Sequence, residues 1–303
     1  MSSLSTKSEI SFDMIQGSVL LNELMSRHTS WRVGGPVDYW FVPSDKRDLS
    51  RFLNILPIEI PIYWMGLGSN LLVRDGGFRG AVICTHGGLS KLEIRQNNEV
   101  YAGAGVACAK LARRTARAGL SGAEFMAGIP GTVGGALAMN AGAFGAETWD
   151  LVNEVEIVNR CGDVEKRPRI DFSTGYRNVQ LRKNEWFLGA VFNLSPSESI
   201  TTRNQVLEIL DVRLEKQPIG SASAGSVFQN PGNDYAARLI ESAGFKGQRV
   251  GGAMVSSKHA NFIINESNAS AADIEELIRI IQVEVCKQFQ INLQLEVRIV
   301  GVK

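Results

Sequence analysis

Glycine is concentrated in one stretch of the chain, GAEFMAGIPGTVGGALAMNAGAFG at residues 122–145. Each glycine in a helix or loop costs roughly 0.5–1 kcal/mol relative to alanine. So much glycine therefore indicates that the backbone here comes close to something else. A dinucleotide pyrophosphate is the natural ligand for such a segment, and close packing of a helix against a sheet is the alternative.

A second glycine segment, WMGLGSNLLVRDGGFRG, occupies residues 64–80 and begins just after a predicted strand. Gly66, Gly68, Ser69 and Asn70 can form a tight turn whose backbone amides converge on an anion. The segment is neither a Walker loop nor a complete GxGxxG motif, so a plain tight turn is the alternative. Two such segments in one chain favour a long ligand with two phosphates.

The pattern of apolar residues predicts an α+β fold built in sections. Strand, helix and strand patterns fill residues 31–83, and residues 84–195 are glycine-rich with short strands and two helices. One of these helices is predicted to end at Gly119 as a C-cap, and the other follows the GIPG motif. The elements show no regular βαβ rhythm, which favours an α+β architecture.

From residue 197 onward the pattern is more helical. Ser270 and Asp273 resemble a capping box at the start of one helix. The final LQLEVRIV alternates apolar and polar residues, which predicts a strand with Glu296 and Arg298 on its polar face. An earlier helix is predicted to end at Pro218, and its expected apolar face consists of Val206, Leu207, Leu210 and Leu214.

Composition limits the partners and the compartment. The 303 residues include 32 Lys and Arg against 31 Asp and Glu, so no general charge attracts nucleic acid or a membrane surface. The chain opens without a signal-peptide pattern, and no apolar run reaches the roughly 20 residues of a membrane span. Its four cysteines are far apart and its three histidines lack ligand spacing. We expect a cytoplasmic protein without a bound metal, membrane insertion or a nucleic-acid partner.

Several blocks occur in a recognisable order: HTSWRVGGPVDYW, GLGSNLLVRDGGFRGAVI, GIPGTVGGALAMNAGAFG, GYR, SAGSVFQNP and LEVRIVG. Together they resemble the UDP-N-acetylenolpyruvoylglucosamine reductases, from about residue 20 to the C-terminus. The resemblance implies a two-subdomain FAD-binding module of the vanillyl-alcohol-oxidase (PCMH) type, followed by an α+β substrate-binding domain. The expected sections are an N-terminal extension, two FAD-binding subdomains and the substrate-binding domain, at residues 1–19, 20–83, 84–196 and 197–303.

The resemblance also implies an NADPH-dependent flavoenzyme of peptidoglycan precursor synthesis. Such an enzyme uses non-covalently bound FAD and NADPH to reduce the vinyl ether of UDP-N-acetylglucosamine enolpyruvate to UDP-N-acetylmuramate. The implied FAD contacts come mainly from the two glycine segments. They are Gly66, Leu67, Gly68, Ser69, Asn70, Leu71, Gly128, Ile129, Pro130, Gly131, Thr132, Gly134, Gly135, Asn140 and Gly142.

The matching motifs imply a catalytic serine, arginine and glutamate. Hydride addition to the vinyl ether leaves negative charge to stabilise and a carbon that must receive a proton. Ser226 in SAGSVFQNP matches the proton donor, which acts as an acid and needs no neighbouring histidine. Arg177 in GYR and Glu296 in LEVRIVG match the groups that hold the substrate carboxylate as charge develops.

Other residues are expected to contact the substrate. Lys216 is the candidate cation that assists Ser226. A lone histidine before an apolar run is as often a satisfied core residue, so His259 is open to both interpretations. The residues expected to line the sugar-nucleotide pocket are Tyr176, Asn230 and His259.

The chain departs from the family pattern in places. Gln229 stands where a lysine is common, and Asn178 and Val179 stand where a serine is common. The segment between Arg177 and Ser226 is short, which resembles the branch without an inserted tyrosine loop over the substrate diphosphate. How the diphosphate is held in this chain is therefore an open question.

Two other functions are alternatives. One is an FAD-dependent sugar or aldonolactone oxidase of the same fold, against which the final LEVRIVG argues. The other is a non-catalytic UDP-sugar-binding protein, against which the intact Ser226, Arg177 and Glu296 argue. Nothing in the sequence reveals the oligomeric state, and we favour a monomer.

Overall fold

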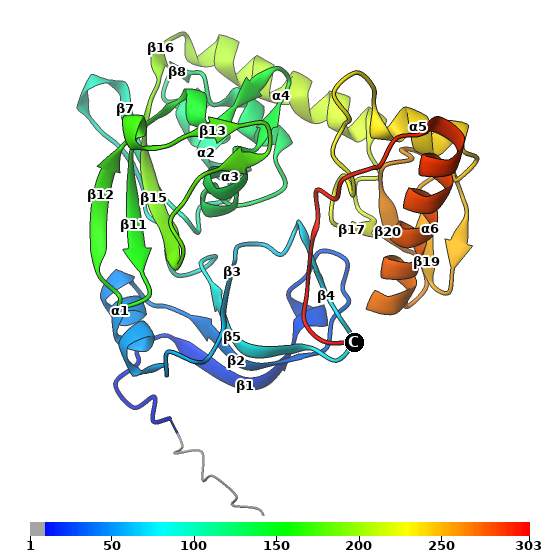
Figure 1. Cartoon of the computed structure of the whole chain (residues 1–303). Helices are drawn as coiled ribbons and strands as arrows, with labels where there is room; N and C mark the ends of the chain where they lie inside the picture. Colours follow the sequence, from blue (N-terminus) through cyan, green and yellow to red (C-terminus); the bar gives the residue numbers. More distant parts are fainter. Residues whose placement is uncertain (1–9) are drawn as a thin grey trace, which may run out of the picture.

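The computed structural model describes residues 10–303, which form three larger sheets with helices packed on them (Figure 1). Residues 1–9, which include about half of the predicted N-terminal extension, lie outside the described residues. In Figure 1 the three sheets lie at the left, the bottom and the right of the molecule. This arrangement places segments that are distant in sequence around one centre.

The first sheet has the strand order β1-β2-β5-β3. β1 and β2 are antiparallel, whereas β2 and β3 both run parallel to β5. Phe41 of the sheet stacks on Phe52 of α1 at a ring-centroid distance of 4.0 Å, so the helix closes one face. The elements are β1 (Ser18–Leu24), η1 (Met25–Arg27), β2 (Pro36–Val42), α1 (Lys46–Ile55), β3 (Ile62–Met65), β4 (Leu71–Val73) and β5 (Phe78–Cys84).

The second sheet is antiparallel, with the order β12-β11-β15-β7-β6. The predicted C-cap is confirmed, because α2 ends just before Gly119, whose φ is 70°. α2 and α3 contribute Leu111 and Leu137 to the core beneath this sheet. The elements are β6 (Leu92–Ile94), η2 (Gln96–Asn98), β7 (Glu99–Gly103), α2 (Cys108–Arg117), η3 (Glu124–Gly128), α3 (Val133–Met139), η4 (Thr148–Asp150), β11 (Val152–Asn159), β12 (Val164–Pro168), η5 (Arg169–Asp171) and β15 (Glu185–Asn193).

The third sheet, β17-β20-β19-β18, carries two helices of the C-terminal part. The predicted capping box is confirmed: Ser270 Oγ accepts from the Asp273 amide, and Asp273 accepts from the Ser270 amide. Ile274, Leu277 and Ile281 of α6 are buried against the sheet. The elements are β17 (Ala222–Ser223), α5 (Ala236–Ser242), β18 (Arg249–Val250), β19 (Ala253–Val255), β20 (Ile263–Asn265) and α6 (Ala271–Phe289).

Short antiparallel pairs complete the described fold. β9 and β10 form one hairpin at the end of the glycine segment at residues 122–145, and β13 and β14 form another. Each hairpin is short enough for its turn to set the direction of a single side chain. The pairs are β8 (Leu120–Ser121) with β16 (Ser195–Pro196), β9 (Gly142–Ala143) with β10 (Ala146–Glu147), and β13 (Thr174–Gly175) with β14 (Asn178–Val179).

Helix α4 (Ser199–Lys216) packs against α2 and η3 rather than against the third sheet. Its buried side chains are Thr202 and Val206, and Thr202 Oγ1 donates to the Ala116 carbonyl at 2.8 Å. The predicted apolar face is wrong for Leu207 and Leu214, which are 58% and 60% exposed. The polar Thr202 occupies the contact with α2 instead, and a pattern of apolar residues does not indicate a buried threonine.

The final strand is shorter than the alternation predicts. Regular pairing covers only β21 (Arg298–Val300), which lies parallel to β4, while Leu295 forms an isolated bridge with Phe228. The prediction of a continuous strand was wrong, although Leu293 and Val297 are buried as the alternation indicates. This segment passes from the third sheet to β4 and so joins two sections of the molecule.

Candidate active site

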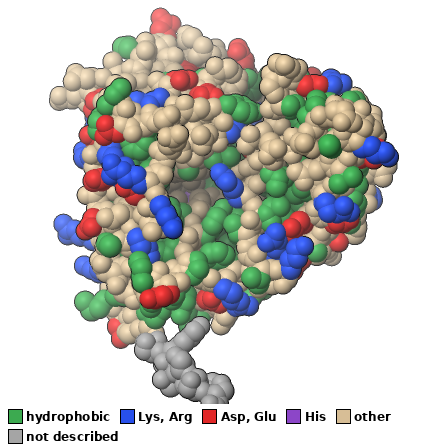
Figure 2. Space-filling model, viewed as in Figure 1, with side chains coloured by type: hydrophobic (Ala, Val, Ile, Leu, Met, Phe, Trp, Pro, Cys, Tyr) green, Lys and Arg blue, Asp and Glu red, His purple; other side chains and the backbone are tan. Residues whose placement is uncertain are grey.

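A cleft lies where the three sections meet, with an empty volume of about 1400 Å³ that includes its open mouth. Figure 2 shows a hollow at the centre of this face of the molecule. Both glycine segments, the β13–β14 turn and parts of the third section line it. Because lining residues come from all three sections, a ligand in the cleft contacts each of them.

The cleft lining contains most of the predicted FAD contacts. Gly134 and Asn140 are the two that do not line it. Those that do are Gly66, Leu67, Gly68, Ser69, Asn70, Leu71, Gly128, Ile129, Pro130, Gly131, Thr132, Gly135 and Gly142.

The two glycine segments touch one another at the cleft. A Cβ on Gly66 would lie 2.2 Å from Thr132 Oγ1, so a larger residue there would displace the segment at residues 122–145. Gly68 has a φ of 63°, and its Cβ would lie 2.3 Å from the His28 carbonyl oxygen. The Thr132 hydroxyl is buried and has no hydrogen-bond partner within residues 10–303. An unpaired buried hydroxyl at a cleft wall is suited to an acceptor on a bound ligand.

Gly134 and Asn140 have structural partners instead. A Cβ on Gly134 would lie 2.8 Å from the Ala104 Cβ, so this glycine allows α3 to approach the strand segment. Asn140 is buried in the left-handed conformation at the end of α3, and its amide bonds Glu147 and the Gly175 carbonyl. Their placement supports the alternative of close packing, and gives no support to a contact with FAD.

Arg177 and Glu296 form an ion pair within the cleft. Arg177 Nε donates to Glu296 Oε1 at 3.1 Å, and Arg177 Nη2 donates to the Gly142 carbonyl at 3.2 Å. Arg177 occupies the β13–β14 turn with a φ of 53°, a left-handed conformation that is uncommon for a residue with a side chain. The hairpin therefore fixes the direction from which this guanidinium enters the cleft.

Ser226 lies beside this pair along the backbone. The Glu296 amide donates to the carbonyl of Val227 at 2.8 Å, which holds the segment after Ser226 against the segment before β21. Ser226, Arg177 and Glu296 all line the same cleft. The structure thus brings together three residues that lie far apart in the sequence, as the motif assignment requires.

The charges in the cleft are few. Arg177, Glu296 and Arg298 are the charged residues of its lining in the described part of the chain. Burial raises the pKa of Glu296, and the neighbouring Arg177 opposes this without cancelling it. Burial also raises the pKa of Tyr63 to about 12, so this phenol keeps its proton at neutral pH.

The other predicted substrate residues do not line the cleft. Tyr176 is 50% exposed, with the Arg177 guanidinium 5.0 Å from its ring centroid. Lys216 is exposed at the end of α4. Asn230 Oδ1 accepts from the Ala236 amide at the start of α5.

His259 also has a structural neighbour. Its ring meets Phe262 edge to face at a centroid distance of 4.8 Å, and burial lowers the pKa of the imidazole. Phe262, not His259, lines the cleft. Contacts of Tyr176, Lys216, Asn230 and His259 with the substrate therefore stay predictions.

Several lining residues have no counterpart among the residues predicted to form the site. Arg298 could have been found from its place two residues after Glu296 on the same face of the final segment. Met139 and Phe262 carry no signal in the sequence that separates them from ordinary core residues. Gln217 also lines the cleft, whereas its neighbour Lys216, the candidate cation, does not.

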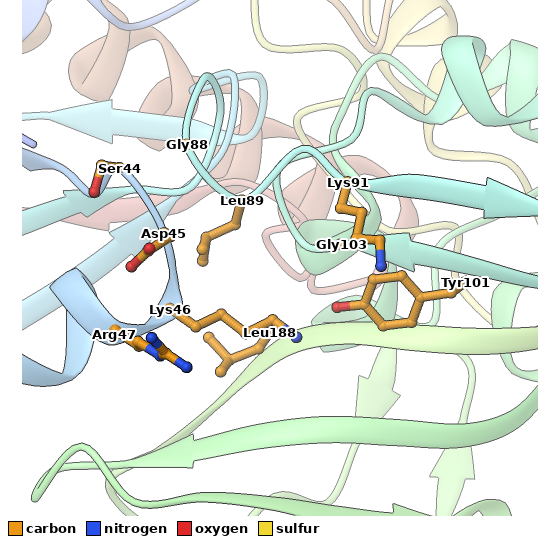
Figure 3. A pocket seen from close by; sticks show the side chains of 10 residues that line it. All are labelled: Ser44, Asp45, Lys46, Arg47, Gly88, Leu89, Lys91, Tyr101, Gly103 and Leu188. Atoms are coloured by element: carbon orange, nitrogen blue, oxygen red, sulfur yellow. The ribbon is translucent and has the colours of Figure 1, made fainter.

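A second hollow lies away from the glycine segments, between the start of α1 and the second sheet (Figure 3). Lys91 Nζ is 2.9 Å from Glu93, and Lys46 pairs with Glu156. The hydroxyl of Tyr101 donates to the same Glu156 carboxylate at 2.9 Å. The pair of Lys46 with Glu156 joins helix α1 to the second sheet, and we assign no ligand to this hollow.

The described residues offer neither a metal centre nor a membrane-spanning helix. Within residues 10–303, no group of three or more His, Cys, Asp or Glu side chains is arranged to hold a metal ion. No helix in this part of the chain has the length and apolar character needed to cross a bilayer.

Comparison with known proteins first defines the class. A family model described as "FAD binding domain" matches residues 37–166, which include both walls formed by the glycine segments. The chain is therefore an FAD-binding flavoprotein, and the predicted fold of a PCMH-type module followed by a C-terminal α+β domain is confirmed. A second model, described as "UDP-N-acetylenolpyruvoylglucosamine reductase, C-terminal domain", matches residues 217–300.

Full-length relatives then give the family. The UDP-N-acetylenolpyruvoylglucosamine reductase of Alkalilimnicola ehrlichii is 53% identical, over 92% of this chain and 93% of the relative. That of Legionella pneumophila is 49% identical, over 94% and 93%. The crystal structure of the Thermus caldophilus enzyme (MurB) is 32% identical, with a TM-score of 0.81, and covers 95% of this chain and 100% of that one. The chain belongs to the UDP-N-acetylenolpyruvoylglucosamine reductase family.

Proposed function

We propose that this chain is the NADPH-dependent flavoenzyme that reduces UDP-N-acetylglucosamine enolpyruvate to UDP-N-acetylmuramate in peptidoglycan precursor synthesis. One observation carries the proposal beyond family membership. Ser226, Arg177 and Glu296, which match the family's catalytic positions, line a single cleft together with both glycine segments. FAD, when bound, supplies the hydride that NADPH provides.

The residues present fit FAD. Glycines at both segments leave the backbone open to the cleft, and a Cβ on Gly135 would meet nothing closer than Thr132 Oγ1 at 4.0 Å. The unpaired hydroxyl of Thr132 offers a donor for a phosphate oxygen. The residues that would hold FAD are accordingly those of the two glycine segments that line the cleft.

Arg177 is proposed to bind the carboxylate of the enolpyruvyl group. Hydride addition to the terminal vinyl carbon moves the electron pair of the double bond toward the adjacent carbon and this carboxylate. A guanidinium placed on the carboxylate oxygens binds the resulting enolate more tightly than the substrate. Glu296 in its protonated form can donate a hydrogen bond to the same oxygens, which its raised pKa favours.

Ser226 is proposed to complete the reaction as the acid. Its hydroxyl proton passes to the carbon next to the carboxylate, where a new C–H bond forms and the enolate charge is discharged. The serine oxygen then regains a proton from water. General acid catalysis of this kind contributes about 10²–10⁴-fold to a rate.

The context of the activity follows from the same proposal. We infer that the enzyme works in the cytoplasm, where its nucleotide substrates are found, and that it acts as a monomer on small molecules. It needs no nucleic acid and no membrane insertion. The division into an extension, two FAD-binding subdomains and a substrate domain is part of the proposal, with the last boundary moved to about residue 217 because α4 packs on α2.

An anaerobic redox experiment tests this function. The purified protein should be yellow, and NADPH should bleach it in the absence of oxygen. Addition of UDP-N-acetylglucosamine enolpyruvate should then restore the colour and yield UDP-N-acetylmuramate. Recolouring by oxygen alone, with a sugar or lactone as the reductant, would indicate the oxidase alternative, and protein that NADPH does not bleach would indicate the non-catalytic one.

A further inference from the structure

Gln217 lies at the end of α4, where the chain passes from the FAD-binding part to the C-terminal domain. Gln217 is one of the residues that line the cleft. Its backbone amide donates to the Arg213 carbonyl at 2.9 Å, so the last turn of the helix holds it in place. It is thus a polar side chain on a fixed backbone at the wall of the site.

The orientation of the Gln217 amide is set by its neighbour Arg213. Arg213 Nε donates to Gln217 Oε1 at 3.1 Å. Because a guanidinium has donors and no acceptor, the oxygen of the amide must face it. The Nε2 group is then left over, and it has no hydrogen-bond partner among the described residues. Two N–H donors therefore remain for a ligand in the cleft.

Arg213 brings a positive charge to this wall. Its Nη1 donates to the Ala127 carbonyl at 3.4 Å, beside Gly128 of the glycine segment at residues 122–145. Within residues 10–303, no carboxylate lies within ion-pair distance of it. Burial lowers its pKa, as expected for a cation without a counter-ion. An unneutralised cation behind the Gln217 amide favours an anionic acceptor in front of it.

We propose that Gln217 is a substrate-binding residue whose side-chain amide donates to an anionic oxygen of the UDP-sugar, and that Arg213 is the positioning residue that fixes this orientation. We assign the acceptor to the substrate because Gln217 lies outside both glycine segments and outside residues 37–166, which match the FAD-binding domain. The next cleft-lining residues along the chain are Ala224, Gly225 and Ser226. This inference rests on the proposed function, and it supplies a donor for a substrate anion where Lys216 is exposed and does not line the cleft.

Gln217→Glu tests the donor with little change of shape. The carboxylate still accepts from Arg213, so the fold is kept, but the N–H donors are replaced by an oxygen that repels an anion. Binding of UDP-N-acetylglucosamine enolpyruvate to the oxidised holoenzyme, followed by the flavin absorbance, should weaken at least tenfold. The dissociation constant of FAD, followed by the fluorescence of released flavin, should stay unchanged. Gln205→Glu, at an exposed position of α4, makes the same charge change and should alter neither.

Arg213 variants test the positioning role. Arg213→Met removes the donor that orients the amide, and it should raise the KM for the enolpyruvyl nucleotide several-fold more than it lowers kcat. Arg213→Lys restores a donor toward Gln217 Oε1 and should recover part of the loss. A merely structural role would instead lower thermal stability without a change in KM that lysine recovers.

Each outcome has a defined meaning. Unchanged nucleotide binding in Gln217→Glu would overturn the inference, and so would weaker FAD binding with unchanged nucleotide binding. Wild-type holoenzyme that fails to bind the nucleotide at all would contradict the proposed function together with this inference. Weaker nucleotide binding in Gln217→Glu alone, with wild-type turnover intact, supports both.

Discussion

Glu296 is buried beside a single arginine, and this sets a stability that depends on pH. Burial raises its pKa above the ordinary value of 4.5. A carboxyl with a raised pKa contributes stability that is fully present below its unfolded pKa and is lost as pH rises through the folded pKa. We therefore predict that the FAD-free wild type loses unfolding free energy relative to Glu296→Gln as pH rises from about 4. Urea unfolding of both proteins across pH 4–8 measures this difference.

Glu275 provides a control of opposite sign. Arg74 Nη2 lies 2.9 Å from its carboxylate and lowers the pKa of Glu275. Its contribution is present above the unfolded pKa and is lost as pH falls, so the difference between wild type and Glu275→Gln should grow with pH. Parallel slopes for the Glu296 and Glu275 variants would contradict the assignment of the buried carboxyl.

Single residues were predictable where a motif marks them. Ser226, Arg177 and Glu296 each stand in a recognisable block, and the structure places all of them in the cleft lining. Gln217 was missed because its function depends on a partner one helical turn away, which composition does not reveal. The charge of Lys216 makes it the candidate cation in the sequence, but the neighbouring Gln217 is the residue that lines the cleft.

Helix α3 contains two adjacent glycines with different tasks. Gly134 faces Ala104, and its Cβ would lie 2.8 Å from that of Ala104, whereas Gly135 faces the open cleft. Gly134→Ala should therefore destabilise the protein by about 1–3 kcal/mol through overpacking. Gly135→Ala should stabilise the FAD-free chain by about 0.5–1 kcal/mol, because alanine favours the helix, yet weaken FAD binding. Urea unfolding and FAD titration measure the two effects.

The comparison of the two variants carries its own control, because the chemical change is identical. Equal FAD affinity of Gly135→Ala and the wild type would show that FAD does not approach this face of α3. Equal stability of Gly134→Ala and the wild type would show that the contact with Ala104 can relax. Either result would require a different explanation for the glycine content of this segment.

Elements were predictable where the signal is local. The capping box at Ser270 and the C-cap at Gly119 use residues adjacent to the helix that they end, and the structure confirms both. The burial of Val206 in α4 was predictable, but that of Thr202 was not, because Thr202 contacts Ala116 of another helix. The final strand is predicted too long, because alternation of apolar and polar residues indicates which side is buried but not whether a partner strand is present.

At the scale of the whole molecule, Trp31 links the first section to the third. Its side chain is fully buried in the core around α5 and α6, and Nε1 donates to the Ile263 carbonyl at 2.7 Å. Trp31→Ala should lower the unfolding free energy by about 3–5 kcal/mol, because it leaves a large cavity. It should also separate the unfolding of the third section from that of the rest.

Two probes follow the sections separately. In Trp31→Ala the four remaining tryptophans all lie outside the core of the third section, so their fluorescence reports on the first two sections, and hydrogen exchange of α6 reports on the third. Trp186→Ala is the control: this side chain stacks on Trp64 at 5.1 Å, outside the third section. It should destabilise the protein while the two probes keep one transition. Coincident probes in Trp31→Ala would contradict the proposed link.

The general architecture could be predicted from the sequence, but the convergence of the three sections on one cleft could not. The glycine segments and the change to helical patterns after residue 197 indicate sections of different kinds. The insertion of Trp31 beneath β20 and the return of the last strand to β4 depend on contacts over more than two hundred residues. Local patterns carry no information about such contacts, and it is these contacts that form the cleft.

The convergence of Ser226 with Arg177 and Glu296 is tested most directly by the two half-reactions of Ser226→Ala. The variant should be bleached by NADPH at the wild-type rate in the absence of oxygen. Its reoxidation by UDP-N-acetylglucosamine enolpyruvate, followed by stopped-flow absorbance, should be about 10²–10⁴-fold slower. Ser221→Ala, an exposed serine nearby, should behave as the wild type in both steps. Reoxidation of Ser226→Ala at full speed would contradict the account.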